Sequence, residues 1–129
     1  MSLTFNQLSH RYDNQQVLVD VNLGVCTGEI LAILGPSGSG KTTLLRLAAG
    51  LEILQTGQII FNDTLIADEK FHTPPEERSS AVVFQDHILF PHLTVQENVA
   101  FGRSENASSS IVDLLTSVGI ENLSSRYPD

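Results

Sequence analysis

The chain has little of what several classes of protein depend on. Its 129 residues include one cysteine, one methionine and no tryptophan. A single cysteine, Cys26, excludes an internal disulfide and a cysteine-based zinc site, and this usage fits a reducing cytosolic compartment. We expect Cys26 to be packed in the interior, where free cysteines are common.

Positive charge is also scarce. Lysine and arginine number 7 against 15 acidic residues, so the net charge is −8. Such a chain repels polyphosphate backbones, which disfavours a nucleic-acid partner, and any bound phosphate needs a local positive site. No apolar run approaches the roughly 18 residues that span a bilayer, and the polar first six residues do not form a signal peptide. If a membrane is involved, a partner spans it.

Hydrophobic periodicity predicts several strands. Apolar residues recur near period two over residues 3–8 and alternate strictly over residues 17–25, as in half-buried strands. Residues 57–61 and 64–67 flank the pair Asn62-Asp63, a pattern typical of a β-hairpin.

Two further segments are apolar at every position. Residues 30–34 suit a strand that is covered on both faces in a mostly parallel sheet, and we expect them to form the centre of the fold. Residues 81–84 predict another apolar strand after the loop at Pro74-Pro75.

Capping signals predict three helices. Residues 43–49 are rich in helix formers and stop at Gly50. Thr94 with Glu97 forms a capping box that opens a helix over residues 95–101, closed at Gly102. A third helix is expected over residues 111–118, with serines before it and a glycine after it.

Between the strand at 30–34 and the first helix lies the pattern G-x-x-x-x-G-K-T, which is the P-loop pattern in its confirming context. Its small residues let the backbone approach phosphate oxygens and aim N–H groups into one concavity at a helix N-terminus. The sequence therefore predicts binding of the ATP phosphates by Gly35, Pro36, Ser37, Gly38, Ser39, Gly40, Lys41 and Thr42.

Three side chains of this loop have expected roles. Lys41 is the compact cation for the β- and γ-phosphates. Thr42 offers a hydroxyl to Mg²⁺, and Thr43 is placed to bond the α-phosphate side. ATP and Mg²⁺ are thus the expected ligands.

Several spaced features together resemble the ATP-binding subunit of an ABC transporter, and the resemblance covers essentially the whole chain. The loop wording Gly-Pro-Ser-Gly-Ser-Gly-Lys-Thr-Thr is the form that this family favours. Tyr12 falls where the family places an aromatic that stacks on adenine. Gln85, which follows an apolar strand, resembles the Q-loop glutamine that touches Mg²⁺ and the attacking water.

An alternative makes Asp86 the Mg²⁺-linked acid of another P-loop class, because such sites use an apolar strand that ends in Asp. We favour Gln85 for the Mg²⁺ contact, since the resemblance places it at the Q-loop glutamine position. Asp20 and Asp113 also end apolar runs, but the first precedes the P-loop and the second lies on a predicted helix.

Residues 89–102 resemble the segment that leads from the Q-loop into the helical subdomain of ABC importers. There it helps to form the groove for a helix of the membrane subunit, so Phe90, Pro91 and Leu93 are candidate docking residues. The alternative is that these residues pack beneath the following helix. His92 has no cysteine or acidic partner nearby in sequence and is a poor ligand candidate. The wording Phe-Pro-His-Leu-Thr is most similar to importers of ferric iron and related small solutes.

The resemblance implies an α/β fold: a P-loop NTPase core with a mixed sheet, an N-terminal antiparallel β subdomain and the start of a helical subdomain. Residues 1–89 would form the core with the β subdomain, and residues 90–129 would begin the helical subdomain. Partners would be transmembrane permease subunits, a second ATP-binding subunit and, indirectly, a solute-binding protein. The subunit would lie on the cytoplasmic face of the membrane as a peripheral protein.

The family's later motifs do not occur in this sequence: a serine-glycine-glycine signature, a strand ending in Asp-Glu and a switch histidine. We therefore expect a truncated domain with an uncovered apolar edge. The full-length protein would be an ATPase that drives transport, with Lys41 and Gln85 among its catalytic groups, while this chain alone hydrolyses little. Two alternatives stay open: a catalytically inactive nucleotide-binding or regulatory module, and another class of P-loop enzyme.

Overall fold

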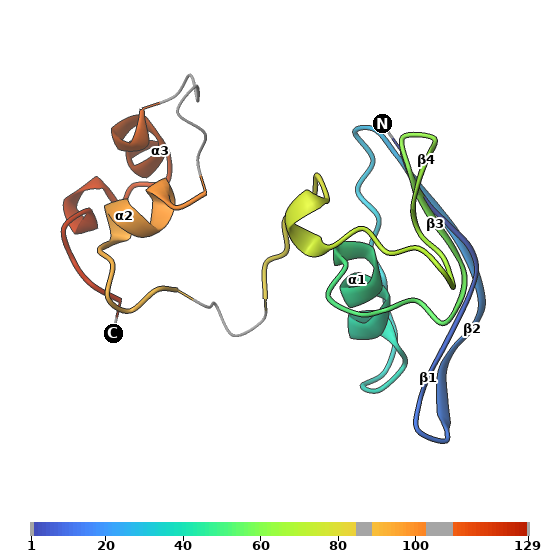
Figure 1. Ribbon diagram of the computed structural model, residues 1–129. Helices are drawn as coiled ribbons and strands as arrows, with labels where there is room; N and C mark the ends of the chain where they lie inside the picture. Colours follow the sequence, from blue (N-terminus) through green and yellow to red (C-terminus); the bar gives the residue numbers. More distant parts are fainter. Residues whose placement is uncertain (1, 85–88, 103–109, 129) are drawn as a thin grey trace. The chain divides into compact units, whose positions relative to one another are not determined.

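The computed structural model describes residues 2–84, 89–102 and 110–128 (Figure 1). The chain forms two compact units, Met1–Val82 and Val83–Asp129. Among the described residues, the first unit contains a sheet and one α-helix, and the second contains two short α-helices. The sequence-based subdivision of one nucleotide-binding domain near residue 90 stays a prediction.

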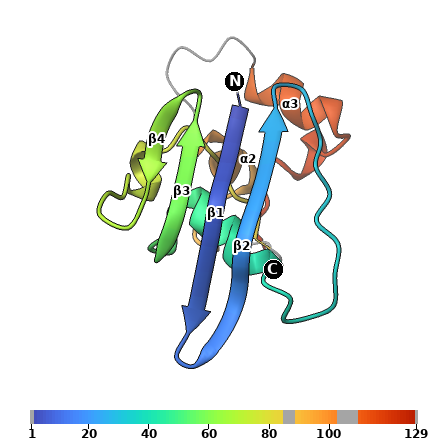
Figure 2. The same ribbon diagram turned by 90° about the vertical axis from the view of Figure 1, so that its right-hand side faces the viewer.

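The first unit is built on a four-stranded antiparallel sheet in the order β2-β1-β3-β4 (Figure 2). Its strands are β1 (Ser2–Tyr12), β2 (Gln15–Cys26), β3 (Thr56–Phe61) and β4 (Thr64–Ala67). Asn62 and Asp63 join β3 to β4 with φ angles of 50° and 62°. Two positive φ angles give a turn whose twist matches that of the strands. The predicted N-terminal strands and the hairpin are confirmed.

A bulge changes which residues of β2 face the core. Leu8 pairs with Val21 and His10 with Leu18, so β2 has one extra residue between these pairs. Leu18 is therefore buried while Val19 is 67% exposed. The strict alternation predicted for residues 17–25 holds on only one side of the bulge.

Helix α1 (Lys41–Ala49) packs on one face of this sheet, as Figure 2 shows. Leu44 and Leu47 of the helix join Leu8, Leu18 and Ile59 of the strands in one hydrophobic core. Full burial of each such side chain stabilises the fold by about 1.5–3 kcal/mol. The core fixes α1, and with it the glycine-rich loop that precedes the helix, to the strands.

The end of α1 follows the prediction. Gly50 has a φ of 78°, and Leu51 donates its N–H to the Arg46 carbonyl at 2.9 Å. This left-handed glycine lets the chain satisfy the last carbonyls of the helix and turn back. The helix begins at Lys41, two residues before its predicted start.

Two predicted strands are not formed. Residues 30–34 and 81–84 have no strand structure, and Ile30 and Leu34 are 96% and 89% exposed. A parallel strand is held by hydrogen bonds to its neighbours, and no strand lies beside either segment within the described ranges. The described sheet is accordingly antiparallel throughout. Residues 30–34 expose apolar side chains, but they are not a strand, so the sheet edge expected beside them is not formed.

Cys26 corrects a smaller prediction. It is the last residue of β2 and is exposed instead of packed. Its pairing partner is Ser2 at the start of β1, so it lies at the end of the sheet, away from the core residues.

The second unit contains α2 (Val95–Ala100), α3 (Ile111–Ser117) and the short 3-10 helix η2 (Glu121–Leu123). Thr94 and Glu97 form the predicted capping box at the start of α2. The Ser110 hydroxyl caps α3 by accepting the N–H of Val112. Both predicted helices are confirmed. None of the helices in the described ranges is long and apolar enough to cross a membrane.

Candidate nucleotide-binding site

The glycine-rich loop is seated on β2 by Gly40. This residue is the N-cap of α1, with a φ of 89°. A Cβ atom at this position would lie 2.5 Å from the Val17 carbonyl oxygen and 2.8 Å from Cδ2 of Leu18. Only glycine combines this backbone conformation with so close an approach. The loop and the start of α1 are thereby fixed to the sheet.

The start of α1 has the electrostatics of an anion site. The first amides of an α-helix have no partner within the helix and carry partial positive charge. Here they belong to Lys41, Thr42 and Thr43, and no acidic residue lies in the first turn. Gly40 has no side chain that could cap these amides, so they can bind a phosphate group.

Lys41 holds its ammonium group against the loop itself. Its Nζ donates to the carbonyl oxygens of Gly35 at 2.9 Å and Pro36 at 2.7 Å. A third contact, to Oγ of Ser39, is longer at 3.4 Å. The cation is therefore placed at the loop by two strong bonds, and the weakest contact is the one that a phosphate oxygen could replace.

The two threonines that follow differ in exposure. Thr42 is exposed in the first turn of α1, together with Ser37 and Gly38 of the loop. Thr43 is only 7% exposed. A hydroxyl that is to bind Mg²⁺ must be accessible, which Thr42 satisfies.

A groove of about 480 Å³ lies beside the loop, between β2, the segment 31–36 and α1. Apart from Ser39 and Lys41, its lining side chains are aliphatic or belong to glycine and proline. Such a surface does not suit a triphosphate, because ionised oxygens lose hydration there without gaining partners. The aliphatic part of this groove therefore offers no partners for phosphate oxygens, whereas the amides at the helix N-terminus do.

Tyr12 lies at the same end of the sheet as the loop. It pairs with Gln15 beside the β1–β2 turn, and Gly40 contacts β2 close to this turn. Figures 1 and 2 both show the loop at the end of the sheet that carries the turn. Tyr12 is 40% exposed, and its hydroxyl donates to Oε2 of Glu52 at 3.1 Å. Its ring is therefore accessible at the end of the sheet where the glycine-rich loop lies.

Gln85 and Asp86 lie outside the described residues, so their competing Mg²⁺ roles stay predictions. Within the described ranges, no group of three or more His, Cys, Asp or Glu side chains could hold a metal ion. The described residues thus offer Mg²⁺ a hydroxyl at Thr42, beside the place where phosphate oxygens would supply further ligands.

The predicted docking residues lie in the second unit. Phe90 is 38% exposed, and its ring lies 4.3 Å from that of Phe101 and 5.9 Å from that of His92, centroid to centroid. Pro91 is exposed and Leu93 is half-buried. Phe90 and Pro91 therefore present apolar surface, while Leu93 partly packs against its own unit.

One amide side chain fixes this loop. Asn98 on α2 accepts the N–H of Phe90 at 2.9 Å and donates to the carbonyl oxygens of Phe90, Leu93 and Thr94. A loop with its backbone groups held at both ends has a defined shape.

The far end of α1 is capped by another unit-1 residue, Arg78. Its Nη1 donates to the carbonyl oxygens of Leu47 at 2.7 Å and Ala48 at 2.9 Å, and its Nε donates to that of Thr73 at 2.8 Å. Arg78 is only 7% exposed, and burial lowers the pKa of its guanidinium. The cation compensates the negative end of the helix dipole.

Comparison with known protein families shows to which family the chain belongs. A family model described as "ABC transporter" matches residues 18–129. The chain belongs to the ABC transporter family. This agrees with the resemblance carried by the P-loop, and the match includes both the loop and the described residues of the second unit.

Individual members of the ABC transporter family are similar over almost the whole chain. The "Sulfate/thiosulfate import ATP-binding protein CysA 1" of Agrobacterium fabrum is 41% identical over 99% of this chain and 39% of its own length. The "Fe(3+) ions import ATP-binding protein FbpC" of Haemophilus influenzae is 39% identical over 98% of this chain and 38% of its own length. The chain spans about two fifths of the length of these curated relatives.

A solved structure of the same family has a similar fold. "Structure of a bacterial Atm1-family ABC exporter with ATP bound" matches 94% of this chain and 21% of that chain, with 27% identity and a TM-score of 0.77. The ABC-type fold expected from the sequence is confirmed.

Sequence reasoning missed Glu52, Arg78 and Asn98. Each acts through a contact with residues distant in sequence or on another element. Only Asn98 carries a local signal, because asparagine is a weak helix former and needs a reason to lie within α2. Nothing in the local pattern around Glu52 or Arg78 indicates a partner.

Proposed function

We propose that the chain is the nucleotide-binding part of the ATP-binding, energy-coupling subunit of an ABC importer. One observation carries the proposal: Gly40 seats the P-loop on β2 at the N-terminus of α1, and Lys41 holds its ammonium group at the same loop. Together they give an acidic chain a local positive site for phosphates.

The remaining residues have complementary roles in this proposal. The P-loop backbone, with Ser37 and Ser39, surrounds the phosphates, and Thr43 lies on the α-phosphate side. The exposed ring of Tyr12 stacks on adenine, an interaction that contributes about 1–3 kcal/mol for bases on aromatic side chains. Thr42 and Gln85 would hold Mg²⁺, which neutralises phosphate charge when bound.

The larger assembly belongs to the same proposal. The full-length subunit hydrolyses ATP as a dimer with a second ATP-binding subunit, on the cytoplasmic face of a membrane. It docks on permease subunits through Phe90, Pro91 and Leu93, and the permease receives solute from a binding protein. Support comes from relatives that are named as import ATP-binding proteins. Their names include sulfate/thiosulfate and Fe(3+), so the proposal specifies an importer and not one solute.

We further propose that these 129 residues bind nucleotide without appreciable turnover. Phosphoryl transfer requires a positioned water and a charge-neutralised γ-phosphate. Lys41 supplies charge, and Gln85 would orient water, but the sequence has no Asp-Glu strand end to complete the set.

The test is binding of ATP to the chain by calorimetry, with and without Mg²⁺. Lys41→Ala should lower the affinity for Mg-ATP by at least roughly tenfold, because a charge-assisted contact contributes about 1.5–3 kcal/mol. Lys70→Ala removes an equal charge from an exposed loop of the same unit and should have little effect. Equal affinity of the parent and Lys41→Ala would refute the proposal.

A further inference from the structure

The connection between α1 and β3, residues 50–55, reaches across to the end of β1 that carries Tyr12. Both Glu52 and Gln55 form hydrogen bonds with this end of β1. Glu52 bonds the Tyr12 side chain, and Gln55 bonds the Arg11 backbone. The P-loop opens α1 and this connection follows it, so one short stretch of chain, residues 35–55, joins the phosphate loop to the support of Tyr12.

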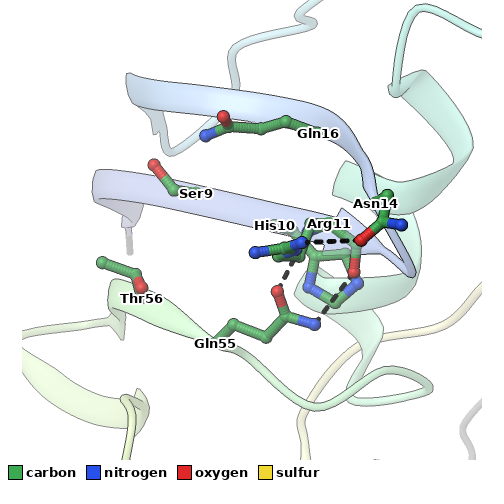
Figure 3. A pocket seen from close by; sticks show the side chains of 7 residues that line it. All are labelled: Ser9, His10, Arg11, Asn14, Gln16, Gln55 and Thr56. Carbon is green, nitrogen blue, oxygen red and sulfur yellow. Dashed lines mark hydrogen bonds between the residues drawn. The ribbon is translucent and has the colours of Figure 1, made fainter.

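Gln55 bonds the backbone of Arg11, as Figure 3 shows, and Arg11 is the residue before Tyr12 in the sequence. The regular pairing of β1 with β3 ends at Ser9 and Thr56. Beyond it, Oε1 of Gln55 accepts the Arg11 N–H at 2.9 Å, and Nε2 donates to the Arg11 carbonyl at 3.0 Å. The side chain thus extends the bonding along β1 from Ser9 to Arg11, the neighbour of Tyr12.

Arg11 ties the same strand end to the turn. Its Nε donates to the Asp13 carbonyl at 2.9 Å, and its guanidinium also reaches Oδ1 of Asn14 at 3.4 Å. Figure 3 shows these side chains around a polar pocket at the strand end. The backbone that carries Tyr12 is therefore held from the connection between α1 and β3 and from the β1–β2 turn.

The Tyr12 side chain is held at two further points. Its hydroxyl donates to Glu52, and its ring makes an edge contact with that of His10, with centroids 4.9 Å apart and planes at 73°. His10 is only 2% exposed, so it is a rigid support. The imidazole nitrogens of His10 have no hydrogen-bond partner within the described residues, so packing rather than polar bonding holds this ring.

We propose that Glu52 is a positioning residue that orients the Tyr12 ring for adenine, with Gln55 and His10 as its supports. The inference rests on the proposed function, in which Tyr12 stacks on the base. An exposed tyrosine without such contacts would lose rotamer freedom when the base binds, and that loss reduces affinity. Because Glu52 holds the hydroxyl, the Tyr12 side chain loses its rotamer freedom when the protein folds, and base binding does not bear this entropic cost.

The test compares two ligands, Mg-ATP and Mg-tripolyphosphate, of which only the first has a base. Glu52→Ala and Tyr12→Phe should each lower the affinity for Mg-ATP by roughly fivefold, the value of one hydrogen bond, and leave that for tripolyphosphate unchanged. The double variant should lose no more than either single variant, because both remove the same bond. Glu52→Gln retains an acceptor oxygen and should recover most of the affinity.

The matched control is Glu76→Ala, which removes an equal charge from an exposed position of the same unit. The inference is overturned if Glu52→Ala weakens both ligands equally, or if the losses of Glu52→Ala and Tyr12→Phe multiply in the double variant. Tripolyphosphate binding also verifies that each variant has folded with its P-loop intact. Tyr12→Ala separates the two proposals: if it leaves the ratio of the two affinities unchanged, base stacking itself is wrong.

Discussion

Gly40 packs against the backbone of Val17, with its hypothetical Cβ only 2.5 Å from the Val17 carbonyl oxygen. Real Cβ atoms do not approach so closely, so any side chain at position 40 must move the loop or the strand. Because Gly40 is also the N-cap of α1, such a shift would displace the first helical amides. The contact therefore couples the fold of the first unit to the geometry of the helix start, where we propose that phosphate binds.

Gly40→Ala should destabilise the first unit by about 2–4 kcal/mol, since the clash adds to the cost of a left-handed alanine. It should also abolish detectable Mg-ATP binding. The matched control is Gly38→Ala, where φ is 81° but no atom lies within 4 Å. Its cost should be only about 1–2 kcal/mol. Urea denaturation measures both, and equal losses would show that the Val17 contact is unimportant.

Arg78→Met should destabilise the first unit by about 2–4 kcal/mol, because it leaves the buried carbonyls at the end of α1 without a donor. Arg46→Met is the control, since Arg46 is exposed in the last turn of the same helix. It should cost less than about 1 kcal/mol. Thermal unfolding followed by circular dichroism gives the comparison, and an equal shift in the two variants contradicts the role assigned to Arg78.

Asn98 should determine the order of the loop at Phe90, and two variants separate its acceptor from its donor. Asn98→Ala removes every bond and should speed amide exchange at Phe90 by roughly tenfold, for a loss of about 1–2 kcal/mol. Asn98→Asp retains the acceptor for the Phe90 N–H and should keep that amide protected. Gln96→Ala, at an exposed position of α2, should change nothing. Unchanged exchange in Asn98→Ala would contradict the prediction.

Glu97 should make the start of α2 sensitive to acid. The backbone N–H of Thr94 and then its hydroxyl donate to the carboxylate, and they lower the pKa of Glu97 below its ordinary value. A group with a lowered pKa in the folded state stabilises above its unfolded pKa, and this contribution is lost as pH falls through the folded pKa. The helix start should therefore weaken only on acidification below roughly pH 4.

An NMR titration of the Glu97 carboxyl carbon measures this shift. Thr94→Ala removes the hydroxyl bond and should raise the Glu97 pKa towards its ordinary value. If Glu97 titrates at the same pH in the parent and in Thr94→Ala, the hydroxyl does not contribute to the shift.

The features that the sequence predicted correctly have local causes. The turn at Asn62-Asp63, the capping box of Thr94 with Glu97 and the glycine at position 50 each depend on residues a few positions apart. The P-loop pattern belongs with them, because its residue spacing by itself sets which backbone groups lie at the helix start. For such features the sequence contains the whole physical argument.

The predictions that failed concern strands, whose formation and register depend on a neighbouring strand that can lie far away in the sequence. Residues 30–34 are apolar enough for a buried strand, but strand structure requires a neighbouring strand, which the described ranges do not supply. The bulge between Leu18 and Val21 arises in the same way, from the register that β2 adopts against β1. Pattern alone cannot reveal either outcome.

The sequence by itself thus determined that a phosphate loop precedes a helix and that Tyr12 is a candidate for the base. Only the tertiary structure decided what supports them: Gly40 against Val17, Glu52 against Tyr12 and Arg78 against the end of α1. The physical reason is the separation along the sequence of the residues that interact. Backbone conformation and helix capping depend on neighbours in sequence, whereas packing and long-range hydrogen bonds depend on which distant residues the fold brings into contact.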